Sequence, residues 1–182
     1  FLGKPLIDWT FDVAKDCGFH SVVVTSNWPE VLKRASERGF IPVSRPESLS
    51  MGNGVIGRVI LHALQAAKVE CDAVCLLNPT SPFRIAKDVA GDIDLWKPGL
   101  QTCLTVRAMT PLFMVRARNE RRGVYHMDKL QQHLPYDRSQ RIPVWVQNGA
   151  VYLIMKQYLE ETLRIVGQRC AIYEMPKERS VD

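Results

Sequence analysis

One stretch of this chain decides its fold class: Ala73-Val74-Cys75-Leu76-Leu77-Asn78-Pro79-Thr80-Ser81-Pro82-Phe83-Arg84. Its first five residues form an apolar run that is typical of a buried parallel strand. The run stops at a polar loop in which two prolines fix φ and stiffen the backbone. Ligands of open α/β sheets bind just beyond the carboxyl ends of the strands. An ordinary strand-to-helix connection would explain this loop taken alone, but the rest of the chain favours a binding site.

The sequence on both sides of this stretch alternates between strand-like and helix-like segments. We expect helices near residues 5–17, 29–38, 55–68, 86–96 and 157–166, and strands near residues 21–25, 40–43, 73–77, 102–106, 144–155 and 169–175. This alternation predicts a single α/β domain over residues 1–182, doubly wound, with a mostly parallel sheet covered by helices on both faces. Such folds normally start with a strand, whereas this chain opens on a helix. The first strand and its loop are therefore expected to be missing from it.

Residues 110–145 interrupt the alternation. Residues 113–118 and 124–127 resemble two strands around a turn, with no helix between them. The pattern predicts an inserted β-hairpin, which in an α/β domain often forms an arm or a lid. Four arginines lie in it, Arg116, Arg118, Arg121 and Arg122. A solvated face is their simplest interpretation, and a phosphate or subunit contact is the alternative.

Composition limits the classes of partner. The net charge of +5 and the pI near 9.0 indicate an anionic partner. The basic residues are dispersed, so a small phosphate-bearing substrate explains the charge as well as nucleic acid does. No apolar run approaches the roughly 20 residues that span a bilayer, so we expect no membrane partner. The five cysteines are odd in number and scattered, which predicts reduced, buried thiols in a cytoplasmic protein.

Two short motifs have simple structural interpretations. The segment Gly52-Asn53-Gly54-Val55-Ile56-Gly57 matches G-x-G-x-x-G. It does not follow a strand, and no acidic residue ends the next strand, so a dinucleotide site is excluded. The pair Asn148-Gly149 favours a tight turn.

Arg45, which follows a strand, is either a surface charge or a donor to a pyrimidine carbonyl or a phosphate.

Six segments, taken together and in order, resemble the acylneuraminate cytidylyltransferases, the enzymes that make CMP-sialic acid. They are Gly3-Lys4-Pro5-Leu6-Ile7, Val22-Val23-Val24-Thr25-Ser26, Arg45-Pro46-Glu47, Leu77 to Arg84, Asn148-Gly149-Ala150-Val151-Tyr152 and Arg179-Ser180-Val181-Asp182. The resemblance implies a nucleotide-binding sheet, a dimerisation arm and a homodimer. It also implies a Mg²⁺-dependent reaction in which CTP and a nine-carbon 2-keto sugar acid give the CMP-sugar and pyrophosphate.

The resemblance also implies roles for single residues. Arg138 would be the catalytic arginine, Arg45 would contact cytidine, Gly54 would lie in the cytosine-binding loop, Asn78, Asn148 and Tyr152 would bind the sugar acid substrate, and Asp182 would hold the metal ion. The chain departs from the family pattern at four internal positions. Asn78 replaces a glutamine, Gly54 and Ile56 replace serines, and Phe113 replaces a lysine. Two alternatives stay open: an inactive nucleotide-sugar-binding protein, and an enzyme for an eight-carbon keto-deoxy acid, although those enzymes lack the proline loop in this form.

Overall fold

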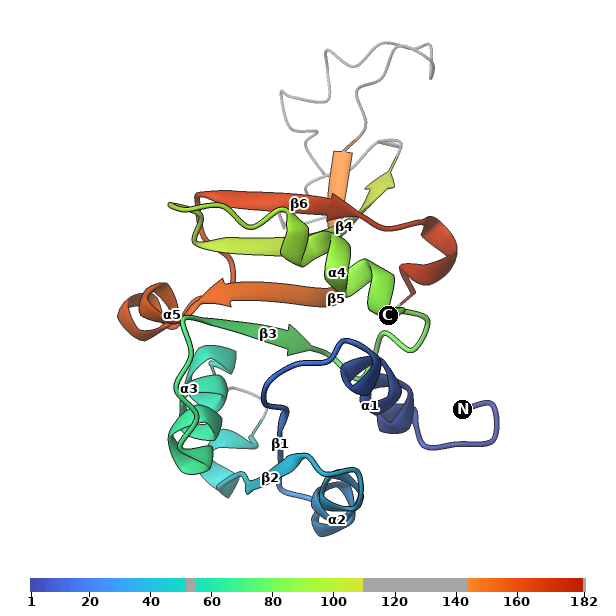
Figure 1. The fold of residues 1–182 in the computed structure, drawn as a ribbon, viewed down its shortest axis with the longest axis vertical. Helices are drawn as coiled ribbons and strands as arrows, with labels where there is room; N and C mark the ends of the chain where they lie inside the picture. The colour runs from blue at the N-terminus through green and yellow to red at the C-terminus, as the bar shows by residue number, and fades with distance from the viewer. Residues whose placement is uncertain (52–54, 110–143, 182) are drawn as a thin grey trace, which may run out of the picture.

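The computed structural model describes residues 1–51, 55–109 and 144–181 (Figure 1). Their helices are α1 (Leu6–Asp16), α2 (Pro29–Glu37), α3 (Ile56–Ala67), α4 (Ala86–Asp94) and α5 (Lys156–Thr162), with 3₁₀ turns η1 (Glu47–Leu49) and η3 (Lys177–Arg179). Their strands are β1 (Val23–Ser26), β2 (Ile41–Ser44), β3 (Ala73–Leu77), β4 (Thr102–Met109), β5 (Val144–Met155) and β6 (Cys170–Glu174). The order of elements matches the sequence expectation, and β3 has the predicted bounds. Among the described strands β3 pairs only with the antiparallel β5, and its residues are half-buried, so the expectation of a buried parallel strand is wrong there.

The described strands form two sheets. Strands β1 and β2 pair in parallel, and the larger sheet has the order β3-β5-β4-β6. Strands β4 and β6 are parallel, whereas β5 lies antiparallel to both β3 and β4. The α/β fold class is confirmed, and the larger sheet is mixed because β5 runs against its neighbours. An apolar run indicates that a strand is buried but not which way it points, so the sequence could not give this direction.

Helices cover both faces of the larger sheet, as the doubly wound prediction requires. One core cluster joins α3 and α5 to the sheet through Ile60, Leu64, Leu104, Val106, Tyr152, Ile154, Tyr158 and Leu159. The other joins α1 and α4 to the opposite face through Val13, Val89, Ala150, Val151 and Met175. Adjacent residues Val151 and Tyr152 fall in different clusters, because successive side chains of a strand point to opposite faces. The helices cover the faces of the sheet and not the carboxyl ends of the strands, which are followed by loops (Figure 1).

Asn148 and Gly149 do not form the expected turn, and that prediction is wrong. They lie inside β5, where the pairing with β4 passes from Leu104–Tyr152 to Val106–Gln147. A single residue of β4 therefore faces four residues of β5, which is a bulge. Gly149 has a φ of +73°. An Asn-Gly pair suits positive φ in bulges as well as in hairpin turns, so the sequence signal was correct for the backbone and wrong for the motif.

Gly57, the last glycine of the G-x-G-x-x-G match, has a packing role. A Cβ atom at this position would lie 2.3 Å from the backbone oxygen of Leu163. Only glycine allows helix α3 to approach the end of α5 this closely. Close packing of α3 against α5 therefore explains why position 57 is a glycine, and no dinucleotide site is needed to explain it.

The predicted arm falls outside the described residues. Strand β4 extends three residues past its expected end, and Met109 pairs with Val144 at the start of β5. Residues 110–143 connect these two antiparallel strands, so the hairpin and its four arginines remain a prediction. All five cysteines are free; Cys103 is buried, but Cys170 is exposed on the edge strand β6, so the expectation of burial is wrong there. Within the described residues, no helix is both long and apolar enough to cross a membrane.

Candidate active site

Polar residues gather at one edge of the larger sheet. Strands β3, β4 and β6 point the same way, so Asn78 after β3, Arg107 near the end of β4 and η3 after β6 lie at the same edge. Strand β5 runs in the opposite direction, and its first half, which contains Asn148, borders this edge as well. Carboxyl ends of strands are the usual ligand-binding edge of open α/β sheets. This edge is the candidate active site.

Asn78 is fixed by its backbone as well as by its side chain. Its Nδ2 donates a hydrogen bond to the backbone oxygen of Gly149 at 2.9 Å. Its own backbone oxygen accepts a hydrogen bond from Arg84 Nη1 at 3.1 Å. Within the described part of the chain, the Asn78 Oδ1 atom has no partner, so it is available to a ligand. The sequence therefore placed Asn78 correctly at the strand end, in a loop that is hydrogen-bonded to β5 and to Arg84.

Arg84 lies buried beneath the proline loop and holds it by hydrogen bonds. Only 2% of the side chain is exposed, and its guanidinium donates to the backbone oxygens of Asn78 and Ala150 and to Thr10 Oγ1. Burial lowers the pKa of Arg84 to about 10, so the group stays charged at neutral pH. Among the described residues no carboxylate lies within ion-pair distance of it. The sequence analysis missed this role, because an arginine after a proline loop gives no signal that it is buried.

Asn148 uses its whole side-chain amide inside the protein. The residue is 5% exposed. Its Oδ1 accepts hydrogen bonds from Thr105 Oγ1 at 2.7 Å and from the Ala150 amide at 3.2 Å. Its Nδ2 donates to Ser180 Oγ at 3.0 Å and to Met175 Sδ at 3.2 Å. Asn148 thus joins the bulge of β5 to the segment after β6, and its expected contact with substrate stays a prediction.

An ion pair between the buried Asp88 and the partly exposed Arg179 anchors η3. Arg179 donates through Nε and Nη2 to the two carboxylate oxygens of Asp88, at 2.9 and 2.7 Å. Asp88 is fully buried and also accepts a hydrogen bond from the Ile85 amide, which caps α4. Hydrogen bonding to Asp88 raises the pKa of Arg179, so the guanidinium keeps its charge. The segment that ends at Val181 is thereby held against α4.

The other predicted site residues are dispersed. Arg45 lies at the end of the smaller sheet, where its amide donates to the Ser26 oxygen at 2.9 Å and its Nε to Ser50 Oγ at 3.2 Å. Tyr152 packs in the core between the sheet and α3, with its hydroxyl 3.5 Å from Gln147 Oε1. Three further predicted residues fall outside the described part of the chain: Gly54, Arg138 and Asp182. The structure thus brings Asn78 and Asn148 together at the bulge.

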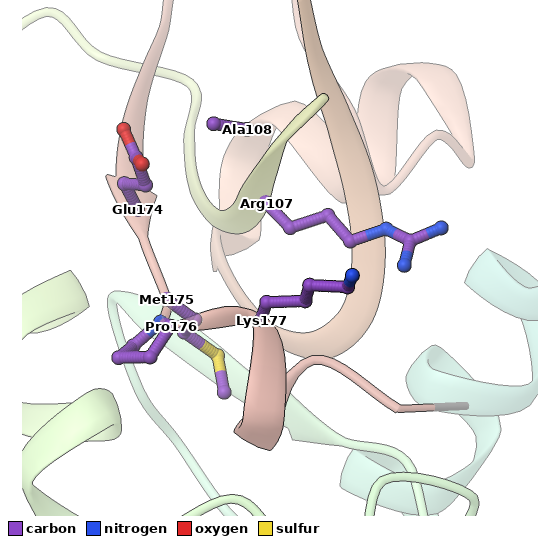
Figure 2. Close-up of a pocket in the computed structure, with 6 residues that line it drawn as sticks. All are labelled: Arg107, Ala108, Glu174, Met175, Pro176 and Lys177. Carbon is purple, nitrogen blue, oxygen red and sulfur yellow. The ribbon is translucent and has the colours of Figure 1, made fainter. Parts of the chain in front are cut away.

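The edge also contains an open cavity that the sequence analysis did not identify. A space of about 310 Å³ is lined by Arg107, Gln147, Asn148, Lys177, Ser180 and Val181. A neighbouring space of about 290 Å³ is lined by Arg107, Ala108, Glu174, Met175, Pro176 and Lys177 (Figure 2). Arg107 and Lys177 line both spaces although they are far apart in the sequence. Only the parallel pairing of β4 with β6 brings them together, so no local sequence signal could have revealed them.

Sequence comparison identifies a curated relative. The N-acylneuraminate cytidylyltransferase of Escherichia coli O18:K1:H7 (strain RS218 / NMEC) is 27% identical over 185 residues, which cover all of this chain. The predicted resemblance is confirmed. The alignment covers 43% of that protein, so this chain spans less than half the length of the curated relative. No protein-family model matches the chain.

Solved structures show the same fold. A CMP:2-keto-3-deoxy-manno-octonic acid synthetase, determined in complex with CTP, superposes with a TM-score of 0.65 at 15% identity, covering 95% of this chain and 80% of its own. The 4-diphosphocytidyl-2C-methyl-D-erythritol synthase of Anaerococcus prevotii gives 0.63 at 9% identity, and the 2-C-methyl-D-erythritol 4-phosphate cytidylyltransferase of Thermus thermophilus gives 0.51 at 11% identity. Each alignment covers 97% of this chain and 82% of the other. The chain therefore has the fold of these cytidylyltransferases.

Proposed function

We propose that this chain is the catalytic domain of a cytidylyltransferase, a nucleotidyltransferase that moves CMP from CTP to a nine-carbon 2-keto sugar acid and releases pyrophosphate. The observation that carries this proposal is the 27% identity with N-acylneuraminate cytidylyltransferase along the whole chain. Two further observations support it. The side chain of Asn78 is hydrogen-bonded at the candidate edge of the sheet, and the net charge of +5 of the full sequence suits anionic substrates.

The proposed chemistry needs no covalent intermediate with the protein. The anomeric hydroxyl of the sugar acid attacks the α-phosphorus of CTP, and pyrophosphate leaves. Catalysis then depends on positioning the two substrates and on stabilising charge at the transferring phosphate. We assign the second task to Arg138. Arg45 and Gly54 would bind the cytidine part of CTP, and Asn78, Asn148 and Tyr152 would contribute to the sugar acid site.

Magnesium is part of the proposal, with most of its ligands supplied by substrate. The described residues contain no group of three His, Cys, Asp or Glu side chains that could hold a metal ion. Mg²⁺ does not need such a group, because it is usually bound by one or two carboxylates plus substrate phosphates and waters. Asp182, next to the anchored residue Val181, would provide a carboxylate. When bound, the ion would neutralise phosphate charge and favour pyrophosphate release.

Pyrophosphate release from CTP tests the proposal, with a panel of 2-keto sugar acids as acceptors. We expect turnover with nine-carbon acids such as N-acetylneuraminic acid. Turnover with eight-carbon keto-deoxy acids alone would favour a cytidylyltransferase for those acids. The structural likeness to the CMP:2-keto-3-deoxy-manno-octonic acid synthetase motivates this second candidate. CTP binding without turnover of any acceptor would favour an inactive nucleotide-sugar-binding protein, the candidate motivated by Asn78, Ile56 and Phe113.

We also propose that the protein acts as a homodimer in the cytoplasm, with residues 110–145 as the dimerisation arm and without nucleic acid or membrane partners. An arm inserted between the paired strands β4 and β5 would extend a surface beyond the domain. Light scattering at micromolar concentration is expected to give the mass of two chains. The mass of one chain would contradict the dimer without affecting the proposed reaction.

A further inference from the structure

Two basic side chains share one open cavity at the candidate active site. Arg107 belongs to β4 and Lys177 to η3, and both line the two adjoining spaces of about 310 and 290 Å³. In Figure 2 the charged head groups of the two side chains extend in the same direction, away from Glu174. Two like charges in this arrangement repel each other unless an anion lies between or beside them.

The local carboxylates do not neutralise this pair. Within residues 1–51, 55–109 and 144–181, neither Arg107 nor Lys177 forms an ion pair. Glu174 lines the smaller space, but its Oε2 accepts a hydrogen bond from Trp145 Nε1 at 3.0 Å and Figure 2 shows it turned away from the two cations. Asp88, the buried carboxylate that contacts η3, is already bound by both ends of the Arg179 guanidinium. Among the described residues, the cavity therefore has two cations and no carboxylate paired with either of them.

The backbone that carries these two cations is held in place. Arg107 is half-buried on β4, where it pairs with Val146 of β5. Lys177 begins η3, and the Asp88–Arg179 ion pair fixes the end of that turn. The cavity wall between them includes Ser180, whose hydroxyl is hydrogen-bonded to Asn148 Nδ2. An anion that binds here does not have to order this backbone, although the exposed Lys177 side chain is ordered on binding.

We infer that Arg107 and Lys177 form an oxyanion subsite at the carboxyl edge of the sheet. The inference rests on the proposed function only for the source of the oxyanion, which is either the carboxylate of the sugar acid or a phosphate of the nucleotide. Both groups present the same chemistry, two or more negatively charged oxygens that accept charge-assisted hydrogen bonds from guanidinium and ammonium groups. The subsite borders Asn148 and the segment that ends at Val181.

Calorimetric titration of the protein and its variants tests the subsite. The variants are Arg107→Gln and Lys177→Gln, and the matched control is Arg164→Gln, which removes an exposed cation that follows α5, at the end of β5 remote from the bulge. The probes are inorganic pyrophosphate, CTP, N-acetylneuraminic acid and its methyl ester, which lacks the carboxylate charge. We expect each variant to weaken one class of probe by about tenfold or more, as loss of a charge-assisted hydrogen bond does, while the control binds normally.

The outcomes separate the two sources. Weaker binding of N-acetylneuraminic acid, with unchanged binding of its ester and of CTP, would assign the subsite to the sugar carboxylate. Weaker binding of pyrophosphate and CTP alone would assign it to a phosphate. Unchanged affinities in both variants, or a native protein that binds none of the probes, would overturn the inference. A protein that loses pyrophosphate affinity in the variants but never releases pyrophosphate from CTP would keep the subsite and refute the proposed function.

Discussion

Asp92 is expected to make the stability of this domain depend on pH. The residue lies on α4 and is fully buried, and both of its carboxylate oxygens lack a hydrogen-bond partner among the described residues. Burial raises the pKa of this carboxyl from an ordinary value of 3.8 to about 7. The neighbouring thiols of Cys75 and Cys103 have pKa values raised by burial to about 12 and about 11, so they stay neutral over the same range.

The sign of the effect follows from this raised pKa. The folded protein binds the proton more tightly than the unfolded chain, so Asp92 has no cost below the unfolded pKa near 4. The cost grows as pH rises and is complete above the folded pKa. A difference of about three pKa units corresponds to about 4 kcal/mol of lost stability. Between pH 5 and pH 8 the loss is about 2–3 kcal/mol, because part of it has already occurred at pH 5.

Denaturation of Asp92→Asn and native protein at several pH values between 5 and 8 measures this loss. The variant cannot ionise at this position. The difference in free energy of unfolding between the variant and the native protein should therefore rise by about 2–3 kcal/mol in favour of the variant from pH 5 to pH 8, which is roughly 5–10 °C in Tm for a domain of this size. Any constant cost of the buried amide cancels in this comparison. Asp94→Asn, on the exposed side of the same helix, is the control. A difference between Asp92→Asn and native protein that does not change with pH would refute the reasoning.

Three other substitutions have defined outcomes. Arg179→Gln leaves the Asp88 carboxylate buried without its cation and should cost about 3 kcal/mol in urea denaturation, with Arg179→Lys less harmful because it keeps the charge; equal costs would contradict a stabilising role of that charge. Gly57→Ala forces a Cβ atom against the Leu163 backbone and should lower Tm clearly, unlike alanine at an exposed position of α3. Arg138→Ala should lower kcat by roughly 10²-fold, with poor rescue by lysine, and an unchanged kcat/KM would remove Arg138 from the proposed site.

The sequence predicted those parts of the fold that local patterns encode. The apolar run 73–77 and the prolines after it gave both the bounds of β3 and the location of Asn78. The direction of β5 was not predictable, because apolar residues indicate that a strand is buried whether it runs parallel or antiparallel to its neighbours. Asn148-Gly149 was misassigned for a related reason: the pair encodes a positive φ, and the surrounding pairing decides whether that backbone makes a turn or a bulge.

The candidate site was only partly predictable. Asn78 and Asn148 belong to segments that the resemblance identified, and both lie at the predicted edge of the sheet. Arg84 and the Arg107–Lys177 pair were missed, because burial and proximity across the sheet come from the tertiary structure and leave no spacing pattern in the chain. Residues that act through distant pairings are beyond sequence reasoning of this kind.

Transfer of the α-phosphate of CTP tests the central claim most directly. The protein is mixed with Mg²⁺, N-acetylneuraminic acid and CTP that carries a radioactive α-phosphate, and the products are separated. A cytidylyltransferase for sugar acids moves the label into a CMP-sugar and releases unlabelled pyrophosphate in equal amount, and only when the sugar acid is present. Label that stays in CTP with every nine-carbon acid, or that appears in CMP without an acceptor, would contradict the account.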